Sequence, residues 1–279
     1  MFDTNPNLIQ VGAAPAAAGS TFGSKAKLAP AILIHDGGGT IFSYYCLGDL
    51  GRRVFGIANP RYESGERYED GIPEMASDYL RFVREAVPEG GDVILGGWSL
   101  GGLVALELAR QLAGERGAVG GPARLNVIGV VMVDSVCPIL GPSPPAGIVK
   151  HVIEWAEHTK EETKTRVLRC FENAVYMVDE QWTPPSWEGK GHPPPVVLLK
   201  ARDTAPVVEA GIAKIDVHRK DPRLGWDAYM KGLITRVIEI PGQHYNLFHT
   251  DDNLRTTTEA LKQACKEVED INKSRKLFG

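Results

Sequence analysis

Short apolar runs alternate along this chain with segments whose apolar residues recur every three or four positions. The run at 92–97 carries no polar alternation, which is typical of a strand that is buried on both faces of a sheet. The periodic segments are typical of helices that bury one face. The predicted strands span 31–35, 53–58, 92–97, 125–134, 194–203 and 234–242, and the predicted helices span 43–50, 74–87, 100–114 and 251–272.

This alternation predicts the α/β class, with a mostly parallel sheet flanked by helices. One stretch breaks the rhythm, because two amphipathic helices, at 146–160 and 164–182, are predicted between the strands that end at 134 and begin at 194. An insertion of this size within an α/β sheet usually covers a site. We therefore predict a helical lid over approximately 139–192.

The N-terminal part of the chain differs in composition from the rest. Residues 11–30 are rich in Ala, Gly, Ser and Pro, which favours a flexible leader or linker over 1–27. A chain of 279 residues is long enough for one large α/β domain, which we place at 28–279. No segment repeats at a fixed period.

Composition and charge narrow the class of protein. Hydrophobic residues make up 43% and charged residues 24%, as in ordinary globular proteins, and the net charge of -4 favours neither nucleic acid nor an anionic membrane as a partner. No apolar run reaches the roughly 18 residues that span a bilayer, and the N-terminus lacks the features of a secretory signal. The cysteines occur without a CxxC pair or a histidine at metal-binding spacing, so we expect reduced thiols, no metal and a cytoplasmic location; they are Cys46, Cys137, Cys170 and Cys265.

The segment "GWSLG" at 97–101 carries the strongest chemical signal. It follows a predicted buried strand and opens a predicted helix, which is the context of the G-x-S-x-G nucleophile elbow. In that turn the serine takes a strained backbone conformation, and the glycines remove side chains that would clash. A glycine-rich packing turn with an incidental serine is the alternative. The flanking elements favour Ser99 as a nucleophile.

A serine hydroxyl needs a base, and this chain has seven histidines. His244 lies in "IPGQHYNLF", directly after the last predicted strand, so its loop projects over the same sheet edge as the elbow. His249 lies nearer the C-terminal helix, which favours a role at the helix entry. We predict His244 as the base.

An oxyanion hole needs two donors that point at the reacting carbonyl. The N–H of Leu100, at the start of the helix after the elbow, is the first. The loop "HDGGGT" at 35–40 follows the first core strand and has the glycine-rich character of the second. We predict the N–H of Gly37, with Gly38 as the next candidate, over a plain glycine turn.

The acid of the site has two candidates. Asp134 and Asp203 each end a predicted strand, and the carboxyl ends of parallel strands lie at the edge where sites form. The residues alone leave both open.

Four segments in this order, "LIHDGGGTIFSYY", "GGWSLGG", "VVMVDSVCP" and "IPGQHYNLF", resemble the thioesterase domains that end fungal polyketide synthases and nonribosomal peptide synthetases. The resemblance covers approximately residues 28–270 and implies the α/β-hydrolase fold. It maps the catalytic Ser, Asp and His onto Ser99, Asp134 and His244, which leaves Asp203 as the alternative acid.

The resemblance also implies a substrate. A polyketide or peptide acyl chain would arrive as a thioester on the phosphopantetheine of an acyl or peptidyl carrier protein, with no cofactor in the enzyme itself. Release would follow by hydrolysis or by cyclisation through an internal nucleophile. No synthase domain precedes the thioesterase segment here, so we expect either action in trans or an excised terminal domain.

Two other functions share these features. An esterase or lactonase for free small molecules would use the same acyl-serine, and a binding protein of this fold could retain the triad with little turnover. Within the predicted lid, four residues have spacings that can turn one apolar face toward an acyl chain, although they could equally pack the lid onto the sheet; they are Trp155, Phe171, Val175 and Tyr176.

Overall fold

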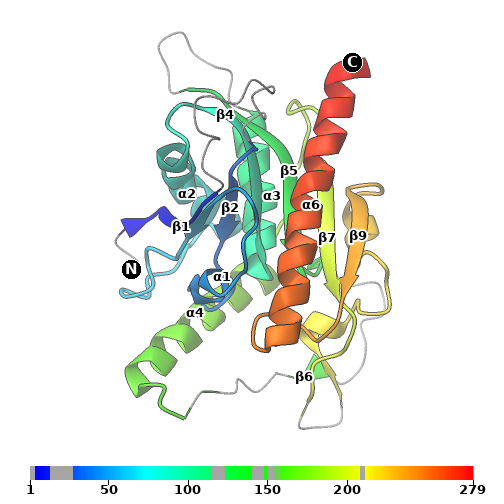
Figure 1. Ribbon diagram of the computed structural model, residues 1–279. Coiled ribbons are helices and arrows are strands. Elements are labelled where there is room, and N and C mark those ends of the chain that lie inside the picture. Colours follow the sequence, from blue (N-terminus) through cyan, green and yellow to red (C-terminus); the bar gives the residue numbers. More distant parts are fainter. Residues whose placement is uncertain are drawn as a thin grey trace.

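The computed structural model describes residues 4–12, 28–114, 123–139, 148–149, 155, 157–207 and 211–278. A seven-stranded sheet lies at its centre, in the order β1-β3-β2-β4-β5-β7-β9 (Figure 1). All neighbouring strands are parallel except β1, which is antiparallel to β3. The strands are β1 (Asn7–Val11), β2 (Ala31–Ile34), β3 (Arg53–Ile57), β4 (Gly91–Trp98), β5 (Leu125–Val133), β7 (Val196–Ala201) and β9 (Ile234–Ile240).

Helices cover both faces of this sheet, which confirms the predicted α/β-hydrolase architecture. Helices α2 (Ile72–Ala86) and α3 (Leu100–Ala113) pack on one face, and α1 (Phe42–Tyr45) and α6 (Asp251–Phe278) pack on the other (Figure 1). The strand residues divide accordingly, since Val130 and Met132 of β5 face α3 whereas Val131 faces α6. Burial on both faces is the reason that β4, β5 and β7 read as largely apolar runs, whereas the edge strand β9 is partly exposed.

The inserted region contributes one long helix, α4 (Glu161–Asp179). It lies across the carboxyl edge of the sheet, beyond the ends of β2 and β4 (Figure 1). Its buried residues occupy one stripe, namely Cys170, Asn173, Ala174 and Met177. Helix α4 falls within the segment 139–192 for which a lid is predicted.

Two sequence predictions need correction. Residues 7–11 were assigned to a flexible leader, but they form β1 and pair with β3, so the sheet begins before Leu28. A helix was predicted over 146–160, but within that range Ile148–Val149 form the two-residue strand β6, which pairs with β8 (Ile212–Ala213). The rest of 146–156, apart from Trp155, lies outside the described residues, as does most of the leader.

Two short elements connect β8 to β9 and were not predicted. They are the 3-10 helix η2 (Lys214–Asp216) and α5 (Trp226–Tyr229). The indole N–H of Trp226 donates to the carbonyl oxygen of Ser135, and the amide of Cys137 donates to that of Leu224. The segment between β8 and β9 is thereby fastened to the chain that follows β5.

Candidate active site

The turn from β4 into α3 places Ser99 at the carboxyl edge of the sheet. Ser99 has φ 55 and ψ -117, a conformation that L residues rarely adopt. Its amide donates to the carbonyl oxygen of Val133 at 2.9 Å, which ties the turn to the neighbouring strand. Ser99 is partly exposed, as a nucleophile that meets a substrate must be.

Each of the four glycines around Ser99 is required by a close approach. A Cβ at Gly96 would lie 2.5 Å from the carbonyl oxygen of Val131, and one at Gly97 would lie 2.6 Å from that of Ile34. A Cβ at Gly101 would collide with the carbonyl oxygen of Ile34 as well. Gly102 has a different neighbour, because its Cβ would collide with the hydroxyl of Ser135. The segment "GGWSLGG" therefore contains no spare glycine.

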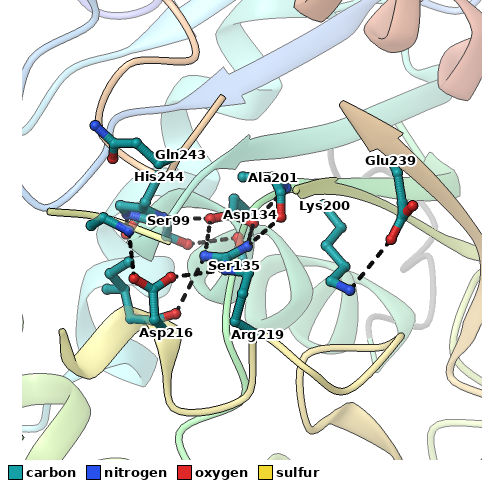
Figure 2. A network of polar contacts seen from close by, with 12 residues as sticks. Ser99, Asp134, Ser135, Lys200, Ala201, Asp216, Arg219, Glu239, Gln243 and His244 are labelled. Atoms are coloured by element: carbon teal, nitrogen blue, oxygen red, sulfur yellow. Dashed lines mark hydrogen bonds and ion pairs between the residues drawn. The ribbon is translucent and has the colours of Figure 1, made fainter. Parts of the chain in front are cut away.

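His244 connects Ser99 to Asp134 (Figure 2). Its Nε2 lies 3.1 Å from the Ser99 Oγ, and its Nδ1 lies 2.8 Å from the Asp134 Oδ2. Because a carboxylate only accepts hydrogen bonds, Nδ1 carries the proton and the lone pair of Nε2 faces the serine hydroxyl. His244 is 3% exposed and Asp134 is fully buried, so water does not compete for the bond between them.

Asp134 follows β5 with φ 49, a left-handed conformation that aspartate tolerates better than most residues. Four donors fill its two carboxylate oxygens: the amide of Ala201, two nitrogens of Arg219 and the Nδ1 of His244. Burial acts to raise the pKa of Asp134, but the bonds from Arg219 and His244 outweigh it and hold the pKa at about 2. The carboxylate is therefore ionised throughout the neutral range.

Asp203, the alternative acid, occupies a different place. Its carboxylate accepts a hydrogen bond from the Gly242 amide at 3.1 Å, and its own amide donates to the carbonyl oxygen of Gly242. The side chain is 53% exposed. Asp203 thus supports the turn that precedes His244, whereas the imidazole itself is bound to Asp134.

The predicted oxyanion donors lie on the two segments that flank the serine. Leu100 is the first residue of α3, where backbone N–H groups have no partner within the helix. In the loop after β2, the Gly38 amide donates to the Asp36 carboxylate at 3.0 Å, so Gly38 is already engaged and Gly37 is the better candidate. Burial raises the pKa of Asp36 to about 6, although the Gly38 amide and the nearby His244 act to lower it.

A buried histidine supports the same loop. The Nδ1 of His35 donates to the carbonyl oxygen of Asp36 at 2.5 Å, and its Nε2 accepts from the Tyr79 hydroxyl at 2.6 Å. Burial lowers the pKa of His35 to about 4, although its bond to the Asp36 carbonyl acts to raise it. The ring is therefore neutral at physiological pH, which suits the one donor and one acceptor that it uses.

Tyr44 supports the elbow from the other face of the sheet, and sequence analysis missed it. Its hydroxyl donates to the carbonyl oxygen of Ile34 at 2.6 Å and accepts from the Trp98 amide at 2.9 Å. The Trp98 ring then packs against His244 and Phe248, with centroids 5.7 Å and 5.0 Å away. The spacing of residues 43–50 predicts a helix but gives no signal of this role for Tyr44.

The four predicted lid residues lie in different surroundings. Phe171 of α4 packs directly over the glycine loop, since a Cβ at Gly37 would lie 3.0 Å from its ring. Val175 is 54% exposed and lies outside the buried stripe of α4. Tyr176 lies between Arg67 and Gln181 at the edge of the helix, and Trp155 is half-buried.

Metal sites, reactive thiols and membrane-spanning helices were also sought in the part of the chain that the structure describes. There, no group of three or more His, Cys, Asp or Glu side chains is placed to hold a metal ion. The four cysteines are free thiols, and burial raises the pKa of Cys137, Cys170 and Cys265 to about 11. Among the described helices, none combines the length and the apolar character needed to cross a membrane.

Comparison with known proteins agrees with this geometry. Residues 30–135, which include Ser99 and Asp134, match the family model described as a thioesterase domain. Thioesterase AMT4 of Alternaria alternata is 36% identical over 241 residues, which cover 86% of each chain. Nonribosomal peptide synthetase imqB of Aspergillus flavus is 31% identical over 99% of this chain, although the match spans only 8% of the synthetase.

A solved structure shares the fold. The NocB thioesterase domain, in covalent complex with a fluorophosphonate nocardicin G analogue, superposes with a TM-score of 0.60 at 25% identity. The match covers 86% of this chain and 95% of that domain.

Proposed function

Because this chain belongs to the thioesterase family, we propose that it is a serine thioesterase that releases an acyl chain from a carrier protein through an acyl-Ser99 intermediate. The acyl chain is a polyketide or a peptide, held as a thioester on the carrier's phosphopantetheine. The bridge that His244 forms between Ser99 and Asp134 is the observation that carries this proposal.

Acylation begins when the Ser99 Oγ attacks the thioester carbonyl carbon. The hydroxyl proton passes to the Nε2 of His244, and the ionised Asp134 stabilises the imidazolium that results. The carbonyl oxygen becomes an oxyanion, which the amides of Leu100 and Gly37 stabilise. The carbon–sulfur bond then breaks, and the thiolate leaves with the proton from His244.

Deacylation repeats the sequence with a second nucleophile. His244 removes a proton from water, or from a hydroxyl or amine of the acyl chain, and that oxygen or nitrogen attacks the ester carbonyl. Collapse of the tetrahedral intermediate returns the proton to the Ser99 Oγ. Water gives a free acid, and an internal nucleophile gives a ring.

The larger protein in which one related sequence occurs supports a carrier-bound substrate. The match to imqB lies within a nonribosomal peptide synthetase, an assembly that holds its intermediates as carrier thioesters. The helix α4 over the carboxyl edge supports a covered site for the acyl chain. The partner that we propose is accordingly an acyl or peptidyl carrier protein.

Serine labelling followed by a substrate panel tests this function. A fluorophosphonate should add once to the wild-type chain and not to Ser99→Ala, as read by intact mass, whereas Ser274→Ala on the exposed face of α6 should label normally. Acyl-pantetheine thioesters should then be turned over faster than p-nitrophenyl esters with the same acyl group.

The other outcomes separate the alternatives. Faster turnover of the free esters would indicate an esterase or lactonase and overturn the carrier proposal. Failure of the wild-type chain to label would indicate a binding protein with an inactive triad. Product mass distinguishes hydrolysis from cyclisation, since the ring lacks the added water.

A further inference from the structure

The guanidinium of Arg219 lies between two buried carboxylates beside the triad (Figure 2). Two of its nitrogens bind Asp134, with Nη1 at 2.6 Å from Oδ1 and Nη2 at 2.8 Å from Oδ2. Its Nε lies 2.8 Å from the Oδ1 of Asp216. Arg219 follows η2, so the segment between β8 and β9 supplies a cation to an acid that follows β5.

All three residues of this Asp134–Arg219–Asp216 cluster are buried. Asp134 is 0%, Asp216 is 2% and Arg219 is 6% exposed. The other oxygen of Asp216 accepts from the Ala205 amide at 2.7 Å, and Arg219 also donates to the Ala201 carbonyl oxygen at 2.8 Å. The orientation of the Asp134 carboxylate is therefore determined by the fork of the arginine, because a bidentate pair fixes both oxygens at once.

This arrangement has an electrostatic cost for the proposed reaction. The imidazolium of His244 is stabilised by negative charge on Asp134, and a guanidinium bonded to the same carboxylate offsets that charge. Asp216 restores it, because two carboxylates and one guanidinium carry a net charge of minus one. His244 thus faces the same net charge as it would beside a single aspartate. In addition, the two hydrogen bonds from Arg219 restrict the movement of the Asp134 carboxylate.

We propose that Arg219 and Asp216 form a charge-balanced positioning pair for the catalytic histidine: Arg219 holds the Asp134 carboxylate in place, and Asp216 cancels the positive charge that Arg219 brings. The proposal rests on the triad chemistry proposed above. It predicts that loss of the charge balance shifts the pH dependence of serine labelling, whereas loss of the positioning lowers the rate of labelling without that shift.

The other groups around His244 stay constant in such a test. Asp36, from the loop after β2, is close enough for its charge to act on His244, and Tyr245 packs edge-on against the imidazole at 4.9 Å. The Trp98 ring on the elbow side carries no charge. These residues are unchanged in every variant below, so a difference between variants reports the cluster itself.

The experiment measures the rate of Ser99 labelling by a fluorophosphonate as a function of pH, which requires no knowledge of the natural substrate. The acidic limb of this profile reports the loss of the neutral histidine. In Asp216→Asn the net charge of the cluster rises to zero, so the imidazolium is less stable and neutral His244 persists to lower pH. The limb should move down by about one pH unit, and the plateau rate should fall several-fold.

Two further variants separate charge from position. The double variant Arg219→Gln/Asp216→Asn returns the cluster to minus one, so its limb should return to the wild-type pH while its plateau rate stays low. Arg219→Lys keeps the charge but loses the fork, so its limb should stay in place and its plateau rate should fall about tenfold or more.

A matched control tests for a merely structural effect. Arg52 and Glu269 form another buried ion pair at 2.8 Å, between the start of β3 and α6. Glu269→Gln should lower the melting temperature and leave the limb unchanged. The proposal is overturned if Asp216→Asn does not move the limb, or if Glu269→Gln moves it equally. If the double variant does not fold, Asp216→Asn and Arg219→Lys decide the question alone.

Failure of the proposed function would look different. If the wild-type chain labels but turns over no thioester, the substrate assignment fails and the charge-balance test still stands. If the chain does not label at all, the triad is inactive and the charge-balance proposal fails with it.

Discussion

The Ser135 hydroxyl donates a hydrogen bond of 2.7 Å to the backbone carbonyl of Ser99, so the residue after the acid supports the residue that bears the nucleophile. Ser135 is fully buried, and its hydroxyl occupies the space beside Gly102 into which a side chain at that position would point. The elbow and the end of β5 are thereby locked together across the site.

Gly102→Ala should therefore destabilise the fold. Helix propensity alone predicts a gain of about 1 kcal/mol for alanine, whereas overpacking against Ser135 costs about 1–3 kcal/mol, so the net change should be a loss. Urea unfolding measures the difference. The double variant Gly102→Ala/Ser135→Gly should recover part of it, and a single variant more stable than the wild type would show that the steric account is wrong.

His244→Ala should reduce serine labelling and thioester turnover by about 10³-fold or more, because the serine then has no base. His249→Ala is the matched control, since His249 is exposed and lies in the turn before α6. It should retain most of the activity. The reverse pattern would transfer the base to His249.

The two candidate acids predict opposite mutational outcomes. Asp134→Asn should lower turnover by several orders of magnitude, because an amide cannot hold the productive tautomer of His244. Asp203→Asn should cost less than about tenfold, since an amide oxygen can still accept from Gly242. Steady-state kinetics beside a thermal melt for each variant make the comparison. If Asp203→Asn loses turnover and Asp134→Asn retains it, Asp203 is the catalytic acid and the assignment to Asp134 is wrong.

Phe171→Ala should change the preference for acyl-chain length more than it changes the rate of serine labelling. The ring covers the glycine loop beside Gly37, so its removal widens the site without touching the triad. Val175→Ala, at an exposed position of the same helix, should alter neither property. Equal losses of labelling and turnover in Phe171→Ala would assign the ring a packing role only.

His35 should make stability depend on pH. Its pKa falls from 6.5 in the unfolded chain to about 4 in the fold, so the unfolded state binds more protons between these values and stability drops as the pH falls through that window. From pH 7 to pH 5 the loss should be about 2 kcal/mol. Urea unfolding of His35→Gln should show a decrease smaller by that amount, and an equal decrease in both proteins would contradict the neutral ring.

Local sequence signals predicted the sheet and the elbow well. The central strands are buried on both faces, so each reads as an apolar run, and the turn at Ser99 is built from neighbouring residues whose glycines are visible together. His244 was identified because its loop follows the last strand. These features depend on contacts that the order of the elements already implies.

The features that were missed depend on partners far apart in the chain. Arg219 reaches Asp134 across 85 positions, and nothing around "VHRKD" distinguishes it from a surface arginine. β1 is an edge strand, and residues 12–52, which include β2 and α1, separate it from β3 along the chain. In α4 the spacing of apolar residues allowed more than one inward stripe, and the buried one includes Asn173, whereas Val175 faces solvent.

The contact between α4 and the glycine loop has an evolutionary consequence. Phe171 rests on Gly37 and Gly38, and the Cys170 sulfur lies 2.9 Å from where a Cβ at Gly39 would be. A larger residue in the loop would displace the helix, and a different helix would disturb the loop, so the two segments must diversify as a unit. New substrate ranges can arise more freely in parts of the insertion that do not touch the loop. A chimaera that borrows 161–179 from a relative should take 36–39 from the same donor.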